Sequence, residues 1–335
     1  MARNNRDWHR QVVEPVLEPE LPICDPHHHL WDFPGSPYLL VDFLADIGGG
    51  HNVVSSVFVE CGAGYRDHGP EHLRPIGEIE FVNDAVPVGG SACDKQPRVA
   101  AGIVGFADLT MGLALEEVLA AMTAAASGRF RGLRHGASWH ASAVIRNSHT
   151  RPPENLLRMD AYQQGVELLG KLGLSFDAWS YHHQLPDLAE LARSCPGTTM
   201  VLNHLGGPLG IGPYAGRAEQ VFEQWREGVA ALADCANVHC KLGGINMKIN
   251  GYDWHQREQP PGSEELAEAT QRYYLWAIEA FGVERCMFES NFPVDGDSCS
   301  YDVLWNSFKR MTASFAEPAR RALFRDNAER FYRLS

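Results

Sequence analysis

The sequence lacks the segments that would place it in a membrane or a secretory pathway. No run of about 18 apolar residues occurs in the chain, so no transmembrane helix is expected. The first 20 residues mix charges of both signs with two prolines and contain no apolar core of the kind a signal peptide needs. The eight cysteines are scattered without a CxxC motif, which indicates reduced thiols rather than a disulfide framework. We therefore expect a cytoplasmic protein without a membrane partner.

Motifs of several other enzyme classes are also missing. The sequence has no GxxxxGK[ST] loop for nucleotide phosphates and no GxSxG nucleophile elbow, and its Gly48–Gly50 run lacks the strand-turn-helix context of a dinucleotide site. The formal net charge of −13 repels the phosphate backbone of nucleic acid and anionic lipid surfaces. The expected partner is a small-molecule substrate, and the sequence leaves open whether the chain forms a homo-oligomer.

Short apolar segments alternate along the chain with longer segments of helical period. This alternation is typical of βα units that form a parallel sheet. The hydrophobic fraction of 44% supplies ample material for a core. The candidate strands are Leu21–Cys24, Val53–Glu60, Val99–Ala107, Gly132–His135, Leu174–Ala178, Thr199–Asn203, Val238–Leu242 and Cys286–Phe288.

Eight such strands predict a (β/α)8 barrel, an α/β fold that routinely forms one domain of this size. We assign residues 1–20 to an N-terminal extension and 21–335 to the barrel. The expected helices are Ala114–Ala126, Asp160–Leu172, Pro186–Arg193, Ala218–Leu232 and Glu264–Phe281, followed by a helical C-terminus at Tyr301–Phe315 and Pro318–Tyr332. Segments 32–52, 62–75, 136–158 and 205–217 are expected to be long loops, most of them on the face where barrels place their chemistry.

A histidine pair directly follows the first candidate strand, in the segment Asp25–Asp32 with the sequence DPHHHLWD. Because side chains alternate along an extended chain, His27 and His29 point the same way and His28 points the opposite way. Two imidazoles so placed can bind one divalent cation or hold one substrate carbonyl.

This HxH element with its tryptophan resembles the first-strand signature of the amidohydrolase superfamily, in particular its amidohydrolase-related branch. That branch includes sugar-acid lactonases, pyrone-dicarboxylate lactonase and, more distantly, decarboxylases of aromatic acids. The segment Leu323–Tyr332 is similar to the closing helix of those proteins, so the resemblance covers essentially the whole chain. It implies a metal-dependent hydrolase on a (β/α)8 barrel.

Further candidates lie at the ends of later strands. His204 begins a His-Leu-Gly element after the sixth strand, and this element resembles one in the same family. Asp177, at the end of the fifth strand, either faces the cavity or caps the following turn. His182 and His183 follow it, and the sequence does not decide which of them belongs to the site.

Two basic residues and a glutamate complete the candidate substrate-binding set. Alternation puts Arg134 on the face of Gly132, where its guanidinium can bind a carboxylate or a lactone carbonyl, or else tie loops together. Glu60 and Lys241 occupy strand positions where barrels carry functional groups, and they can equally pair with one another inside the barrel.

The eighth strand departs from the family pattern. Its segment Cys286–Asp295 resembles one in which an aspartate serves as metal ligand and general base, but this position is Asn291. An amide does not accept a proton at neutral pH. Either Asp295 or Glu289 can supply the carboxylate if the loop folds inward, or the reaction departs from the usual hydrolytic mechanism.

These residues favour hydrolysis of a lactone by water attacking its carbonyl. The predicted catalytic residues are His27, His29, His204, Asn291 and Asp295. The three histidines among them form the expected metal site, for which zinc suits three nitrogen donors. Asn291 leaves a metal-independent reaction open. Two alternatives also stay open: non-oxidative decarboxylation on the same barrel, and a barrel that binds a ligand without turning it over.

Overall fold

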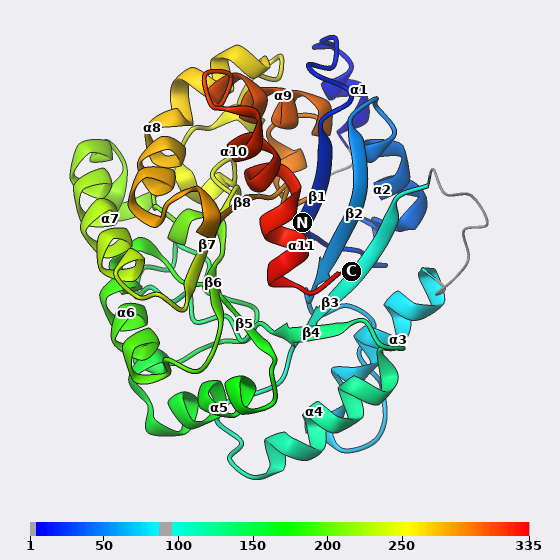
Figure 1. Ribbon diagram of the computed structural model, residues 1–335, viewed down its shortest axis with the longest axis vertical. Helices are drawn as coiled ribbons and strands as arrows, with labels where there is room; N and C mark the ends of the chain where they lie inside the picture. The colour runs from blue at the N-terminus through cyan, green and yellow to red at the C-terminus, as the bar shows by residue number, and fades with distance from the viewer. Residues whose placement is uncertain (1–4, 87–95, 335) are drawn as a thin grey trace.

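The structure, a computed structural model, describes residues 5–86 and 96–334. Its centre is an eight-stranded parallel sheet in the order β1 to β8 (Figure 1). A bridge between His28 and Phe292 joins the first strand to the segment after the last one. The strands are β1 Pro22–His28, β2 Asn52–Val59, β3 Arg98–Gly105, β4 Phe130–Leu133, β5 Ser175–Ala178, β6 Met200–Leu202, β7 Val238–Leu242 and β8 Cys286–Phe288. The predicted (β/α)8 barrel is therefore confirmed.

Helices surround this sheet, as Figure 1 shows. They are α1 Arg6–His9, α2 Leu40–Ile47, α3 Ile76–Ala85, α4 Ala114–Ala125, α5 Asp160–Lys171, α6 Leu185–Ser194, α7 Ala218–Ala233, α8 Ser263–Phe281, α9 Tyr301–Met311, α10 Glu317–Arg321 and α11 Asn327–Phe331. A π-helical turn at Ala322–Asp326 separates α10 from α11. Among the described residues, no helix is both long and apolar enough to cross a membrane.

The expectation that residues 32–52 form a loop is wrong, because this segment contains α2. Phe43 and Ile47, four positions apart, are buried on one face of this helix. The Asp42 carboxylate accepts a hydrogen bond from the Leu39 backbone N–H at 3.0 Å and so caps the first turn. The helix has only eight residues and ends at a glycine run, which explains why its period is weak in the sequence.

Apolar packing occurs on both sides of the sheet, as expected for strands covered on both faces. The larger core lies between the strands and the outer helices. A smaller cluster fills the barrel and joins strand residues such as Val57, Val201 and Met287 to Phe331 and Tyr332 near the C-terminus. Arg98, at the start of β3, forms an ion pair with Glu329. The C-terminal helix therefore closes the N-terminal end of the barrel and leaves the opposite end for the site.

The N-terminal extension lies along the barrel from residue 5 onward, while residues 1–4 and 335 fall outside the described part of the chain. His9 Nε2 lies 2.7 Å from the carbonyl oxygen of Gly296, after β8. Lys309 of α9 donates a hydrogen bond to the Leu17 carbonyl at 2.7 Å. The described cysteines are all free thiols, in keeping with the expected absence of a disulfide framework, and Cys93 lies outside the described residues.

Candidate active site

The histidines of β1 take opposite sides of the strand. His27 and His29 lie on the inner side, with their ring centroids 4.9 Å apart. His28 stacks on Phe43 of α2 at 4.0 Å and lies 3.0 Å from the Ser56 hydroxyl, on the outer side. The Nδ1 of His29 lies 2.7 Å from the carbonyl oxygen of Val59. Because a carbonyl only accepts, the proton of neutral His29 is on Nδ1, and Nε2 carries the lone pair.

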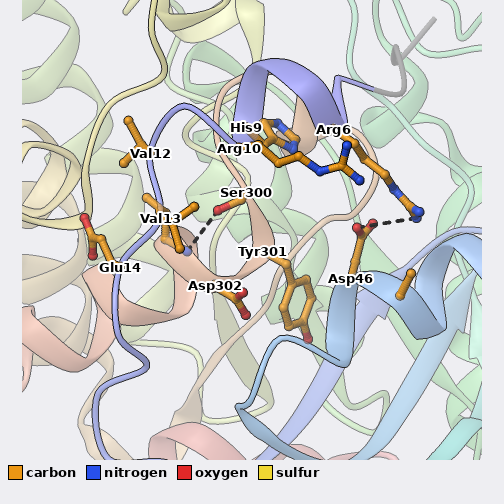
Figure 2. A pocket seen from close by; sticks show the side chains of 12 residues that line it. Arg6, His9, Arg10, Val12, Val13, Glu14, Asp46, Ser300, Tyr301 and Asp302 are labelled. Atoms are coloured by element: carbon orange, nitrogen blue, oxygen red, sulfur yellow. Dashed lines mark hydrogen bonds and ion pairs between the residues drawn. The ribbon is translucent and has the colours of Figure 1, made fainter.

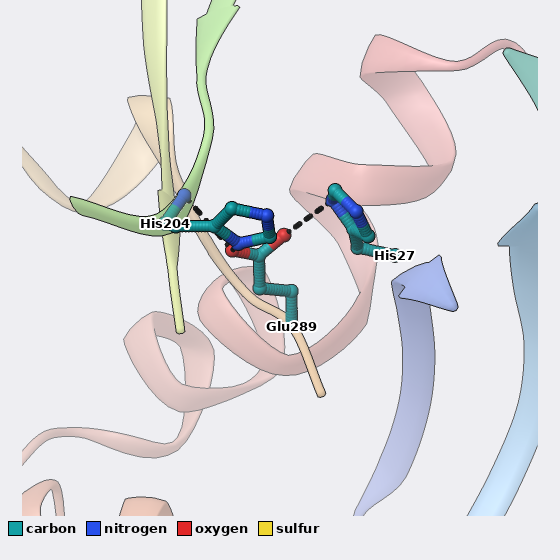
Figure 3. Close-up of side chains that lie close together, drawn as sticks. All are labelled: His27, His204 and Glu289. Atoms are coloured by element: carbon teal, nitrogen blue, oxygen red, sulfur yellow. Dashed lines mark hydrogen bonds and ion pairs between the residues drawn. The ribbon is translucent and has the colours of Figure 1, made fainter. Parts of the chain in front are cut away.

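Glu289, the residue after β8, joins two of the histidines. Figure 3 shows its carboxylate between the imidazole rings of His27 and His204. Oε2 lies 2.9 Å from Nδ1 of His27, and Oε1 lies 2.7 Å from Nδ1 of His204. The backbone N–H of His204 also donates to Oε1 at 3.0 Å. The Nδ1–Oε1 contact of His204 is a hydrogen bond, and a carboxylate only accepts, so the neutral His204 ring carries its proton on Nδ1 and presents Nε2 as the basic nitrogen.

Two glycines after β7 permit this close approach. A Cβ on Gly243 would lie 2.4 Å from Cγ of Glu289, and a Cβ on Gly244 would lie 2.5 Å from Cβ of His204. Gly244 also has a φ of 65°, a region that favours glycine. His204 itself has a φ of 54°, and such a strained backbone is frequent at functional sites.

Burial keeps the three histidines neutral. It lowers the pKa of His27 well below its usual value, and the charge of Lys241 lowers this pKa further. Burial and the charge of Arg134 likewise hold the pKa of His29 well below its usual range. For His204, burial outweighs the opposing effect of Glu289, so its pKa is also lowered. All three rings are therefore available as neutral nitrogen donors or proton acceptors at neutral pH.

Arg134 connects Glu60 to the histidines from the end of β4. Its Nε lies 2.6 Å from Oε1 of Glu60, and its Nη2 donates to the Glu60 backbone carbonyl. Its Nη1 lies 3.3 Å from Nε2 of His27. The second oxygen of Glu60 lies 3.0 Å from Nε2 of His149. The alternative pairing of Glu60 with Lys241 is therefore wrong, since Glu60 is held by Arg134 and His149.

Lys241 instead pairs with Asp177 inside the barrel. Its Nζ lies 2.8 Å from Oδ2 of Asp177, 3.2 Å from Nδ1 of His27 and 4.0 Å from Oε2 of Glu289. The hydroxyl of Tyr332, from the C-terminal end of the chain, donates to the same Asp177 oxygen at 2.8 Å. The interpretation of Asp177 as a turn cap is thus wrong, because its carboxylate lies within the barrel and is fully buried.

Asn291 does not contact the basic nitrogens of the histidines. Its side-chain amide donates to Oδ1 of Asp295 at 3.0 Å, and its backbone has a φ of 55°. The other oxygen of Asp295 accepts from the Asn246 backbone N–H at 3.4 Å. Burial raises the pKa of Asp295 well above its usual value. Of the two carboxylates that the sequence offers here, the structure brings Glu289, not Asp295, to the histidines.

His182 and His183 lie among the loop residues that surround the barrel mouth. The ring of His182 packs against Tyr214 at 4.8 Å, and His183 lies 5.3 Å from His140. Trp179, which follows β5, contacts the ring of His204 edge-on at 4.8 Å. Trp179 therefore lies beside the His204 ring. His182 and His183 contact other loop residues instead and do not lie among the residues around Glu289.

The group His27, His204 and Glu289 fits a divalent metal ion. Each of the three residues offers one possible ligand atom, and these atoms all lie within 4.8 Å of one another. Among the described residues, this is the one group of three or more His, Cys, Asp or Glu side chains that is so close. Two neutral imidazoles and one carboxylate are donors that suit zinc. The predicted set differs, because Glu289 takes the place expected for His29. The ammonium group of Lys241 beside Glu289 opposes a second cation and is expected to weaken its binding.

A separate cleft of about 320 Å³ lies beside the N-terminal extension, as Figure 2 shows. Its residues include Arg6, His9, Asp46 and Tyr301, and it contains none of the predicted site residues. The hydroxyl of Tyr301 donates to Asp25 in β1 at 3.1 Å. This contact ties the floor of the cleft to the strand that carries the histidine pair.

Known proteins resemble this chain over most of its length. A family model described as amidohydrolase matches residues 24–334. An uncharacterized protein of Sinorhizobium fredii, y4mH, is 33% identical over 94% of this chain and 99% of its own length. An L-fucono-1,5-lactonase of Burkholderia multivorans is 25% identical over 92% of this chain and 95% of its own length.

Solved structures show the same fold. An amidohydrolase of Burkholderia multivorans has been solved in two crystal forms, one with bound HEPES and one with bound zinc. The first is 24% identical, with a TM-score of 0.71, and the second is 23% identical, with a TM-score of 0.70. Both matches cover 93% of this chain and 99% of that one.

Proposed function

Because the chain belongs to the amidohydrolase family, we propose that it is a hydrolase that opens a small lactone by addition of water. The observation that carries this proposal is the Glu289 carboxylate, which accepts from Nδ1 of His204 and leaves Nε2 of that ring as the basic nitrogen, with His27 beside its second oxygen. Relatives that act on L-fucono-1,5-lactone, at 25% identity, support a cyclic ester as the substrate.

When the site holds no metal, His204 is the group that accepts a proton from water in this reaction. Asn291 cannot accept one, and Oε1 of Glu289 already accepts from the ring and backbone N–H groups of His204. Water adds to the carbonyl carbon while its proton passes to Nε2 of His204. The ring C–O bond then breaks, and the proton passes to the leaving alkoxide oxygen, which gives a hydroxy acid.

Arg134 is the group proposed to stabilise the negative charge that develops on the carbonyl oxygen. Its Nη1 lies 3.3 Å from His27 in a buried site, where a fixed positive charge acts more strongly than in water. Lys241 lies beside Nδ1 of His27 and is itself held by Asp177, and these contacts inside the barrel fix the orientation of the His27 ring. His29 and Trp179 are proposed to line the space in which the substrate lies.

We also propose zinc as the metal for the group His27, His204 and Glu289. When bound there, zinc would polarise the carbonyl and lower the pKa of a bound water. The zinc-bound amidohydrolase of Burkholderia multivorans supports this choice of ion. The position of Lys241 leads us to expect weaker binding than at a comparable site without a neighbouring ammonium group.

The experiment combines elemental analysis of the purified protein with turnover of a panel of sugar-acid lactones before and after chelation. Ring opening that is lost on chelation and restored by zinc supports the metal-dependent reaction. Ring opening that resists chelation in metal-free protein excludes zinc but keeps the lactonase. Release of carbon dioxide from aromatic or unsaturated acids, without lactone opening, would replace hydrolysis by decarboxylation. Ligand binding without any turnover would indicate a binding protein.

A further inference from the structure

The loop between β4 and α5 brings a histidine to the rim of the barrel, where the proposed reaction gives it no role. Nε2 of His149 lies 3.0 Å from Oε2 of Glu60. The carboxylate of Glu60 is 1% exposed, whereas the side chain of His149 is 32% exposed. His149 therefore separates a buried charged group from the solvent.

Hydrogen bonds on both sides hold His149 in place. The backbone N–H of Ser148 donates to the Ser138 carbonyl at 2.9 Å. The hydroxyl of Thr150 donates to the carbonyl of Gly136 at 2.8 Å. Both acceptors lie just after β4, which also positions Arg134. The tip of this long loop is thus fixed to the strand that carries the site arginine.

The β2 side of the mouth packs closely against the ring. A Cβ on Gly62 would lie 3.2 Å from Cδ2 of His149, and the ring centroid of Phe106 lies 6.2 Å from that of the histidine. The imidazole therefore rests against residues that follow β2 and β3. This defined environment distinguishes His149 from a mobile surface histidine.

Two cationic side chains share the single carboxylate of Glu60. Arg134 lies on Oε1 and His149 on Oε2. Burial and the charge of Arg134 lower the pKa of His149, but the carboxylates of Glu60 and Glu78 raise it, and the net direction is upward. With His149 protonated, the three groups Arg134, His149 and Glu60 together carry one positive charge. Within the described residues no group forms a hydrogen bond with Nδ1 of His149, so its N–H is available to a ligand.

We propose that His149 is a substrate-binding residue that, together with Arg134, selects lactones bearing an additional carboxylate group. A carboxylate at the mouth would accept a hydrogen bond from Nδ1 of His149 and be attracted by the positive charge of Arg134, whose Nε and Nη2 stay on Glu60. It would also neutralise the one net positive charge that Arg134, protonated His149 and Glu60 carry together. This inference rests on the proposed lactonase function and adds the substrate class.

The kinetic test compares D-glucaro-1,4-lactone, which carries a carboxylate, with D-glucono-1,4-lactone, which carries a hydroxymethyl group there. His149→Gln removes the charge, His149→Lys keeps a positive charge, and His72→Gln is the control at an exposed histidine. We expect His149→Gln to raise KM for the carboxylate-bearing lactone by about tenfold or more, as for a lost charged hydrogen bond. KM for the neutral lactone should change by less than about twofold, and His149→Lys should recover much of the loss.

A binding measurement separates this inference from the lactonase function. Calorimetry gives the dissociation constants of D-glucarate and D-gluconate, which require no turnover. Tighter binding of the dicarboxylate by the native chain, lost in His149→Gln and kept in His149→Lys, supports the inference even if no lactone is opened. Equal binding of the two acids by the native chain, or an unchanged preference in a folded His149→Gln variant, overturns it even if lactones are opened.

Discussion

Replacing Glu289 with glutamine is expected to abolish most of the activity while leaving the barrel folded. Oε1 of the native carboxylate accepts from Nδ1 of His204 at 2.7 Å and from the His204 backbone at 3.0 Å, and Oε2 lies 2.9 Å from Nδ1 of His27. Glutamine has one carbonyl oxygen, so its NH₂ group must face one of the two Nδ1 atoms. With the carbonyl oxygen kept at the Oε1 position, where the ring and backbone N–H groups of His204 both donate, the NH₂ group faces His27. His204 then loses the negative charge that stabilises its ring when it accepts a proton.

The substitution is expected to affect both kcat and the free energy of unfolding. Loss of a general base typically costs about 10²- to 10⁴-fold in kcat, which corresponds to roughly 3–5 kcal/mol in the barrier. The buried charged hydrogen bond that is lost contributes roughly 1.5–3 kcal/mol to stability. Steady-state turnover of an active lactone measures the first effect, and urea unfolding measures the second.

Glu78→Gln is the matched control, because it changes another buried carboxylate to an amide. Oε1 of Glu78 accepts from the backbone N–H groups of Cys61 at 2.8 Å and Ala63 at 2.9 Å, and glutamine can keep both bonds. We expect its kcat to stay within about threefold of the native value, far less than an average loss of a catalytic base. A folded Glu289→Gln variant with kcat as high as that of Glu78→Gln would refute the role given to Glu289.

Three further changes test other parts of the account. Tyr332→Phe removes the hydroxyl that donates to Asp177 at 2.8 Å. The free energy of unfolding should fall by about 1 kcal/mol, and kcat should fall by less than about tenfold. No change in either quantity would argue against a link from the C-terminus to the site. Gly243→Ala places a Cβ 2.4 Å from Cγ of Glu289. We expect kcat to fall more than about tenfold and the free energy of unfolding to fall by roughly 1–3 kcal/mol. Turnover at the native rate would show instead that Glu289 can move freely. Burial and the charge of Lys309 lower the pKa of His51 from its ordinary value of 6.5 to about 4 in the folded state. The free energy of unfolding is therefore highest above pH 6.5, where the ring is neutral in both states. It should fall by about 3 kcal/mol as the pH drops toward 4. Urea unfolding between pH 7 and pH 4 should show this loss in the native chain and a smaller one in His51→Gln, and equal slopes would contradict it.

The sequence predicts the barrel because each β strand is marked by a short apolar run. β7 and β8 have the predicted bounds, and the other strands differ by a few residues at their ends. β1 runs four residues further than expected and includes His27 and His28, since the polar segment after the apolar run still pairs with β2. α2 is missed because a short helix beside glycines and prolines has little visible period.

The site is predictable only in part. Alternation along β1 is enough to place His27 and His29 on one side of the strand, and the family resemblance points to the end of β8. The choice between Glu289 and Asp295 depends on how the chain turns after the strand, where Asn291 has a positive φ, and no local pattern fixes that turn. His149 and Tyr332 reach the site network from a long loop and from the C-terminus, so their contacts depend on the assembled barrel.

The most direct test of the lactonase proposal is mass analysis of the product formed from sugar-acid lactones by the native chain and by Glu289→Gln. We predict that the native chain converts a lactone to a hydroxy acid that has gained one water and kept all its carbon, well above the uncatalysed rate. Glu289→Gln should be slower by about 10²-fold or more. Absence of ring opening across the lactone panel, or a product that has lost carbon dioxide, would contradict the account.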